Sequence, residues 1–385
     1  MRKTKKTVAL LCAVLLLVFA LAACSGSGTG TAASADGSQS AAAPAESEST
    51  GEESAAPAES AADAGTIIEG AKVDLDRISV EAVENTEGKE IKIASLCIPY
   101  GPFWLEVVSG IESAKALLAQ EGYNAQVDII TFEDMNAQAM SDAIETCIVQ
   151  QYDVITLFGA SDTLIPAIDK ATAAGIHVYT YNTDTTEPST RVAFVGQDLY
   201  AAGQKSADLM AELLDEKGKV GIITGLFSLS SHELRRTGME DELAEKYPDI
   251  TVIPAVECND NDDVAYTVAK DLITANPDMN GILVTASGQI GVAQAIRDLG
   301  LQGELKMVCF DYQDAIVDGL RDNTIQATIA QGPFDQGANP IIYGYNYCIT
   351  GTPEVEGNAF TALDVITPEN VDEYLDKIGY VYGNG

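Results

Sequence analysis

Short apolar runs alternate with amphipathic stretches along the chain from residue 91 onward. The runs are four to eight residues long, which predicts buried parallel strands. They span residues 91–98, 127–131, 154–158, 176–181, 192–195, 220–224, 251–256, 281–285, 305–310 and 324–329. Between them, apolar residues recur at three- and four-residue steps, as at Phe103, Val107 and Ile111, which predicts helices. The alternation indicates an α/β protein with helices on both faces of its sheets.

Ten strands are more than one sheet comfortably holds, so we expect two sheets in two lobes. Ligands of such sheets bind at the carboxyl ends of the strands. Polar and aromatic side chains follow six of the predicted strands at that end. These candidate site residues are Phe103, Trp104, Asn182, Asp184, His232, Gln289, Asp311 and Gln331. They indicate a cleft for a polar small molecule.

The N-terminus predicts export from the cytoplasm. A basic start is followed by an apolar run of about 14 residues, shorter than the roughly 20 that span a bilayer. Leu21-Ala22-Ala23-Cys24 resembles the lipobox of bacterial lipoproteins, which implies a signal peptide over 1–23 and a lipidated Cys24. An ordinary secreted protein is the alternative. We therefore expect an extracytoplasmic protein that is lipid-anchored to the cell membrane.

Residues 24–90 are expected to hold the lipidated cysteine and a flexible tether. Residues 25–65 consist almost entirely of Ser, Gly, Ala, Thr, Pro and Glu. Such a segment cannot bury enough apolar surface to offset its ordering entropy. Residues 66–90 carry some apolar side chains and form a boundary zone whose order the sequence leaves open.

The charge balance excludes nucleic acid as a partner. The chain has 22 Lys and Arg against 58 Asp and Glu, a net charge of −36, and such a surface repels phosphate backbones. Five cysteines remain beyond Cys24, at spacings too wide for a metal knuckle. We expect them to be mostly buried free thiols, and we expect no metal and no cofactor.

Catalytic motifs are missing from the sequence. It has no Gly-x-Ser-x-Gly elbow, no His-Glu-x-x-His and only two histidines. A dyad of Cys97 and His177 is conceivable because both lie on predicted strands of the first lobe. His177 begins its strand, however, instead of ending it. We therefore expect that the protein is not an enzyme.

Five stretches match one family in order along the chain. They are Pro102-Phe103-Trp104, Val195-Gly196-Gln197-Asp198, the segment 272–278, Phe310-Asp311 and the segment 327–331. Through them, residues 91–366 resemble the type 1 periplasmic binding proteins, nearest the ribose-binding branch. The resemblance implies two Rossmann-like lobes joined by a hinge of three crossing strands, near Gly196, Gly332 and Phe360. Lobe one is then 91–195 plus 332–358, and lobe two is 196–331 plus 359–385.

The resemblance also implies roles for individual residues. Phe103 and Trp104 match a pair that stacks on a sugar ring, and Asp311 and Gln331 match residues that hold its hydroxyls. Further positions match less closely. Asn182 and Asp184 share one family position, Gln289 and Asn259 each take another, and His232 either contacts ligand or caps a helix.

Both arginines of the family cleft are absent from the matching positions, where Asn182-Thr183 and Glu233 stand. The resemblance therefore implies a monosaccharide or similar small polyol, and the missing arginines argue against ribose itself. It further implies a monomeric substrate-binding lipoprotein that delivers its ligand to the membrane permease of an ATP-binding-cassette importer. A sensory receptor, or a carrier for a nucleoside or signalling sugar, is the alternative that the sequence leaves open.

Overall fold

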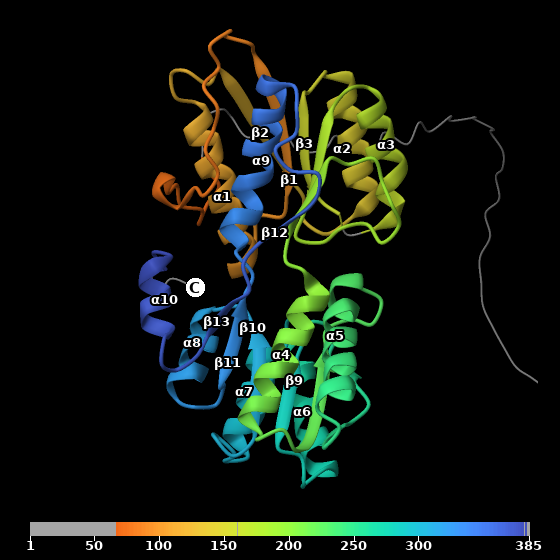
Figure 1. Ribbon diagram of the computed structural model, residues 1–385, viewed down its shortest axis with the longest axis vertical. Coiled ribbons are helices and arrows are strands. Elements are labelled where there is room, and N and C mark those ends of the chain that lie inside the picture. Colours follow the sequence, from red (N-terminus) through yellow and green to blue (C-terminus); the bar gives the residue numbers. More distant parts are fainter. Residues whose placement is uncertain (1–66, 160, 381, 383–385) are drawn as a thin grey trace, which may run out of the picture. The chain divides into compact units, whose positions relative to one another are not determined.

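The computed structural model describes residues 67–159, 161–380 and 382. All of them belong to one unit of the chain, Ala56–Gly385. The predicted signal peptide, Cys24 and the first part of the predicted tether lie outside the described residues. Figure 1 shows that the described part forms two α/β lobes. Each lobe is built around its own sheet.

Lobe one contains a six-stranded parallel sheet in the order β12-β5-β4-β3-β1-β2. Its strands are β1 (Ile91–Cys97), β2 (Ala125–Thr131), β3 (Val154–Phe158), β4 (His177–Tyr181), β5 (Ala193–Gly196) and β12 (Gly357–Phe360). Its helices are α1 (Pro102–Leu118), α2 (Ala137–Val149), α3 (Ile165–Ala173) and α9 (Pro333–Thr350), with short 3-10 turns at η1 (Leu75–Arg77) and η2 (Asp162–Leu164).

Lobe two contains a seven-stranded sheet in which β13-β11-β10-β9-β6-β7 follow one another and β8 pairs with β6. Its strands are β6 (Gly218–Thr224), β7 (Ile250–Val252), β8 (Val256–Glu257), β9 (Gly281–Val284), β10 (Lys306–Phe310), β11 (Ala327–Ala330) and the antiparallel β13 (Asp364–Ile366). Its helices are α4 (Leu199–Leu213), α5 (Ser230–Lys246), α6 (Asp262–Ala275), α7 (Gln289–Asp298), α8 (Asp314–Arg321) and α10 (Val371–Lys377).

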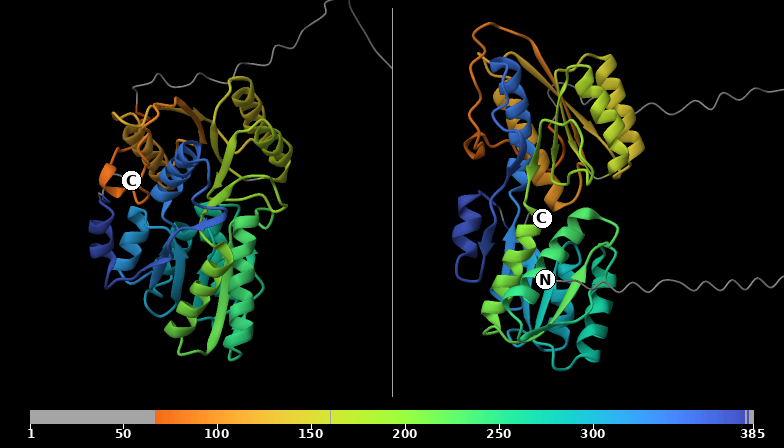
Figure 2. Two further views of the ribbon diagram at one scale, coloured as in Figure 1. Left: turned by 45° about the horizontal axis from the view of Figure 1, so that its top comes forward. Right: turned by 45° about the vertical axis from the view of Figure 1, so that its right-hand side comes forward.

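The central strands of lobe two, β9, β10 and β11, bury both of their faces. Along β10, Met307 and Cys309 pack into one apolar cluster, whereas Val308 and Phe310 pack into another. Side chains alternate between the faces of a strand, so the two clusters lie on opposite faces of the sheet. Helices α6 to α8 cover the first face, and α4 and α5 cover the second; Figure 2 shows this arrangement from two further sides. The predicted fold class, two parallel α/β lobes with flanking helices, is therefore confirmed.

The chain passes from one sheet to the other three times. These crossings follow β5, β11 and β12, at residues 197–198, 331–332 and 361–363. Hydrogen bonds tie the crossings together, because Thr361 N donates to Gly196 O (2.7 Å) and Thr361 Oγ1 donates to Gln331 O (2.8 Å). The cleft described below lies where these crossings bring the two lobes together.

Three strands differ from the pattern-based expectation. The predicted strand 251–256 is two short strands, β7 and β8, separated by Pro254; proline cannot donate to a ladder. The hydrophobic pattern predicted neither β12 nor β13, although the resemblance implied a crossing strand near Phe360. Both are short and β12 is largely exposed, so neither has the apolar run by which buried strands are found.

Residues 67–85, which we call the strap, pack on lobe one. Its backbone N–H groups at Ile68, Lys72 and Asp74 donate to Glu112, Ser109 and Ser113 of α1 over 2.9–3.1 Å. These three α1 side chains are buried and hydrophilic, so they need the partners that the strap supplies. The tether expected over 24–90 therefore does not extend over 67–90, which is part of the folded body.

Candidate ligand-binding site

A cavity of about 230 Å³ lies between the two lobes, lined by side chains from both. Lobe one contributes the start of α1, Phe158 at the end of β3, and the residues after β4. Lobe two contributes α5, the loop before α6 and the residues after β9, β10 and β11. The cavity therefore lies at the carboxyl ends of both sheets, where parallel α/β folds bind their ligands.

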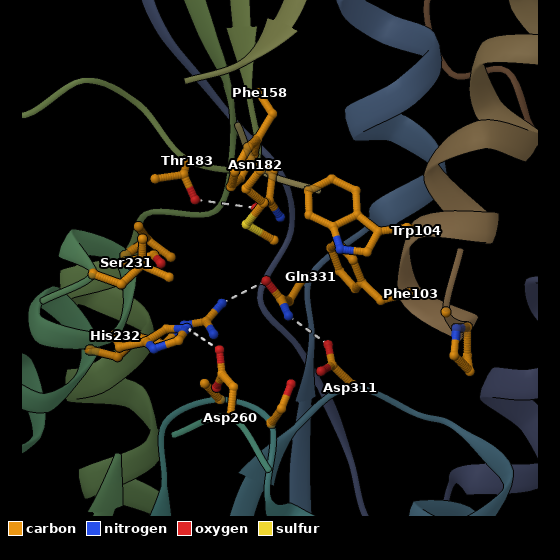
Figure 3. A pocket seen from close by; sticks show the side chains of 18 of the residues that line it. Phe103, Trp104, Phe158, Asn182, Thr183, Ser231, His232, Asp260, Asp311 and Gln331 are labelled. Carbon is orange, nitrogen blue, oxygen red and sulfur yellow. Dashed lines mark hydrogen bonds and ion pairs between the residues drawn. The ribbon is translucent and has the colours of Figure 1, made fainter. Parts of the chain in front are cut away.

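Aromatic rings from lobe one form one wall of this cavity (Figure 3). Trp104 meets Phe158 edge to face at 5.1 Å between ring centroids, and it meets Phe103 in the same way at 5.3 Å. The T-shaped contacts hold the Trp104 ring in place. Gly101, with φ of 83°, makes the sharp turn out of β1, and Pro102 begins α1 directly after it. The wall is a rigid apolar surface on which a ring-shaped ligand can lie.

Arg235 is the buried cation of the opposite wall. Its Nη2 donates to Gln197 Oε1 (2.7 Å) and Gln331 Oε1 (2.6 Å), and its Nη1 donates to Thr285 O (3.0 Å). Its guanidinium lies 4.0 Å above the Phe310 ring. Burial lowers the pKa of Arg235 to about 10, opposed by nearby carboxylates. The side chain remains charged at neutral pH.

The expectation that this wall has no arginine, based on Glu233 at the matching position, is wrong, because Arg235 lines the cavity. Side chains two positions apart on a helix point about 200° apart around the helix axis. Glu233 therefore faces away and pairs with Arg236 at 2.7 Å, while Arg235 faces the cavity. Helix α5 also packs closely against α4. A Cβ atom at Gly203 would lie only 2.1 Å from Arg235 O, so only glycine fits there.

Asp311 ends strand β10 in a left-handed conformation, with φ of 73°. Its carboxylate accepts hydrogen bonds from Gln331 Nε2 (2.5 Å) and Gln289 Nε2 (3.3 Å). Burial raises the pKa of Asp311, against the Arg235 charge and the two amides. Left-handed backbone is costly for a residue other than glycine, and such strain concentrates at functional sites.

His232 and Asp260 complete the polar wall. His232 Nδ1 accepts a hydrogen bond from Leu226 N–H (3.0 Å), so its proton is on Nε2, which faces Asp260 Oδ2 at 3.7 Å. Burial, together with the Arg235 charge, lowers the pKa of His232 to about 4. Burial raises the pKa of Asp260 to about 6, although Arg235 opposes this shift. At neutral pH the histidine is therefore uncharged and the aspartate is ionised.

Six of the residues expected from the sequence line the cavity: Phe103, Trp104, Asn182, His232, Asp311 and Gln331. Three others do not. Asp184 is bonded to Arg191 and Thr180 beside a neighbouring groove. Asn259 is exposed, and Gln289 is buried behind Asp311, which it supports.

Asp260, Arg235, Phe158 and Met135 are among the cavity residues that the sequence did not single out. A signal for Arg235 was present, because it follows His232 by three residues, and residues at that spacing share one face of a helix. Asp260 carried a weaker signal, as the residue next to the expected Asn259 in a loop after a strand.

Catalytic and metal-binding constellations are not found in the described part of the chain. No group of three His, Cys, Asp or Glu there could hold a metal ion. The register pairs Ile93 with Val154 and Val154 with His177, so Cys97 lies four residues, about 13 Å, further along the sheet than His177 and two strands away from it. The conceivable dyad is therefore not assembled. The thiols of Cys97, Cys147, Cys258, Cys309 and Cys348 are all free.

Comparison with known proteins gives consistent results. The model of the periplasmic binding protein domain family matches residues 99–350. A D-apiose import binding protein of Actinobacillus succinogenes is 25% identical over 247 residues, which is 63% of this chain and 77% of that protein. A D-ribose/D-allose-binding protein of Pseudomonas aeruginosa is 26% identical over 234 residues, 58% of this chain and 72% of that one.

The fold is also similar to solved structures. A sugar-binding protein of a sugar ABC transporter from Bacillus halodurans superposes with a TM-score of 0.67 and 26% identity, covering 74% of this chain and 99% of that one. Among residues 67–159, 161–380 and 382, no helix has the length and apolarity needed to cross a membrane. From its matching family model, its two-lobed fold and its cleft, the chain belongs to the periplasmic binding protein family, type 1, in the ribose-binding-like branch.

Proposed function

We propose that this protein captures a monosaccharide or a similar small polyol for an ATP-binding-cassette importer. The observation that carries the proposal is the cavity between the lobes, with Trp104 and Phe103 on one wall and Asp311 and Arg235 on the other. An aromatic face packs against the C–H groups of a sugar ring, while carboxylate, guanidinium and amide groups bind its hydroxyls. The named functions of the relatives support this assignment.

Ligand capture would proceed by closure of the lobes about the three crossings. A ligand on the Trp104 wall reaches Asn182 in lobe one and Asp311 in lobe two. Because it bonds to both lobes at once, it favours the conformation in which they are close. A membrane permease that recognises the closed pair of lobes would then receive only loaded protein.

Three finer assignments are part of the proposal. The lipobox-like Leu21-Ala22-Ala23-Cys24 supports a lipid anchor at the outer face of the cell membrane. A single cavity formed within one chain supports a monomer, since both walls come from the same molecule. The polar groups of the wall are hydrogen-bonded to one another, as Arg235 is to Gln331 and Gln331 is to Asp311. This arrangement supports binding of the ligand without chemical conversion.

The test is a fluorescence titration. Trp104 is the only tryptophan of the chain and lines the cavity, so its emission reports on the bound ligand. Pentoses, hexoses, polyols and nucleosides are added to residues 67–385, and we expect a saturable change at micromolar concentrations of a sugar or polyol. Asp311→Ala should weaken this binding by at least roughly tenfold, because a charged hydrogen-bond partner is lost.

The matched control is Asp318→Ala, which removes an exposed carboxylate of lobe two outside the cavity. A folded protein that responds to none of the sugars or polyols would contradict the proposal. A response to nucleosides alone would favour the carrier alternative.

A further inference from the structure

The ionisable side chains that line the cavity are Arg235, His232, Asp260 and Asp311. Arg235 donates through its two Nη groups to Gln197, Gln331 and Thr285, and its Nε is buried without a partner. Both carboxylate oxygens of Asp311 accept from side-chain amides. Asp260 differs from Asp311 in this respect.

The Asp260 carboxylate has no hydrogen-bond donor within the described part of the chain. Its Oδ1 is buried without a partner, and its Oδ2 is 3.7 Å from His232 Nε2, beyond hydrogen-bond distance. A buried acceptor without a donor costs stability. The Asp260 side chain lines the cavity and is 30% exposed, so a ligand in the cavity can donate to this carboxylate (Figure 3).

The backbone around Asp260 holds the side chain in this position. Asn259 and Asp260 both have left-handed φ, 56° and 51°. The loop is fixed on either side, because Cys258 N donates to Thr224 O (2.8 Å) and Asn261 Oδ1 accepts from Val264 N at the start of α6. This strained backbone is stabilised by the loop contacts even though the carboxylate is unpaired.

Space for the carboxylate comes from a glycine. A Cβ at Gly225 would lie 2.0 Å from Asp260 Oδ1 and 2.7 Å from the His232 ring. Any larger residue at position 225 would displace both side chains. The site is therefore shaped to keep the carboxylate against the end of β6 and facing the cavity.

We propose that Asp260 forms a donor-selective subsite, which binds a hydroxyl or ammonium group of the ligand and excludes acidic sugars. The inference rests on the proposed function, since it assigns the class of sugar that the cavity accepts. A hydroxyl or an ammonium group supplies the missing donor, and the ammonium also pairs with the charge of the carboxylate. A carboxylate or phosphate on the ligand would bring no donor and would meet the Asp260 carboxylate at close range.

The experiment compares three forms of the same ring. D-Glucose, D-glucosamine and D-glucuronate, and the same three forms of galactose, are titrated against residues 67–385 at neutral pH. We expect glucuronate or galacturonate to bind at least roughly tenfold more weakly than its neutral parent, and the amine to bind at least as tightly as the parent. The ratio of the affinity for the amino sugar to that for the neutral parent shows whether the subsite prefers an ammonium or a hydroxyl group.

Asp260→Asn tests the residue itself. The amide has the shape of the carboxylate but no charge, so the ratio of acid to parent affinity should move toward one. Asp271→Asn is the matched control, because it removes the same charge from an exposed position on α6 and should leave the ratio unchanged. Gly225→Ala, which displaces the Asp260 side chain without altering any charge, should reproduce the effect of Asp260→Asn.

Two outcomes would overturn the inference alone: wild-type protein that binds the acid as tightly as the parent, or an unchanged ratio in both Asp260→Asn and Gly225→Ala. In either case a sugar still binds and the proposed function stands. Folded protein that binds no sugar or polyol in either series, nor in the wider panel above, would overturn both.

Discussion

The pair formed by His232 and Asp260 shows how neighbouring residues acquire opposite charge states from one environment. Burial disfavours the charged form of each, so the pKa of the histidine is lowered to about 4 and that of the aspartate is raised to about 6. The histidine is thus neutral across the physiological range. Of these two residues, only the aspartate titrates just below neutrality.

This difference predicts the pH dependence of ligand binding. A donor on the ligand prefers ionised Asp260, so the affinity should be full above about pH 7 and fall as the pH drops through about 6, where the raised pKa lies. The other titratable and charged groups around it are His232, Arg235, Asp311 and Cys258, of which Asp311 also has its pKa raised by burial. Titrations at pH 5 to 8 measure the dependence.

Asp260→Asn separates these groups, because it should flatten the profile between pH 5 and 7. A profile that keeps its full slope in this variant would instead assign the titration to Asp311. The Asp271→Asn control should keep the wild-type slope.

Among single residues, the sequence identified those placed directly after a long apolar strand. Trp104, Asn182 and Asp311 follow β1, β4 and β10, and each lines the cavity. Arg235 and Asp260 escaped prediction for different physical reasons. The first depends on the rotation of α5 about its axis, and the second depends on two left-handed residues in a loop that begins after a two-residue strand.

At the level of elements, helix α5 is connected to the crossings through Arg235. Its guanidinium binds Gln197 in the first crossing and Gln331 in the second, and Gln331 O accepts from Thr361 in the third. Arg235 therefore contacts two of the crossings directly and is linked to the third through Gln331. We expect rotation of the lobes about the crossings to change the hydrogen bonds of Arg235.

Arg235→Lys is expected to weaken the binding of every sugar by a common factor of roughly ten or more. Lysine retains the charge but has a single ammonium group, which cannot bind Gln197, Gln331 and Thr285 in the fixed geometry of the guanidinium. The ratio of acid to parent affinity should remain as in wild type. Calorimetric titration of the wild type and variant with both sugars measures both quantities.

The control is Arg236→Lys, the next residue, whose guanidinium pairs with Glu233 and Glu240 on the surface of α5. It should bind sugars as wild type does. Equal affinities of the Arg235 variant and wild type would show that the bonds to the crossings do not contribute to binding.

The helices and the long buried strands were predictable because their hydrophobic periodicity is strong. Strands β12 and β13 were not, since their residues are mostly exposed or half-buried and their pairing with β5 and β11 is set by distant parts of the chain. The strap illustrates the same limit. Its partners are the hydrophilic side chains of α1, which no local pattern in residues 67–85 reveals.

For the molecule as a whole, the three crossings are the only covalent links between the sheets of the two lobes within the described residues. Gln331 and Gly332 lie in the second crossing, and Gly332 has φ of 65°. We expect saturating ligand to lower the radius of gyration of residues 67–385 in small-angle X-ray scattering, because closure brings the lobes together. Asp311→Ala at the same sugar concentration should remain at the ligand-free value.

A radius that does not change, although Trp104 fluorescence shows binding, would mean that the protein binds its ligand without closing. The two-lobed plan was predictable from the number of strands and the resemblance of the five stretches. How far the lobes rotate was not, because it depends on the balance between ligand bonds and bonds such as those of Arg235.

The strap has a mechanical consequence. It fastens to α1 through hydrogen bonds from Ile68, Lys72 and Asp74, and to α9 through Ser79, whose hydroxyl donates to Asp335 (2.8 Å). Both helices belong to lobe one. Tension applied along the chain ahead of residue 67 would therefore be borne in shear by lobe one and would bypass the crossings. A tether attached at this end of the strap therefore transmits its load to lobe one and not to the hinge between the lobes.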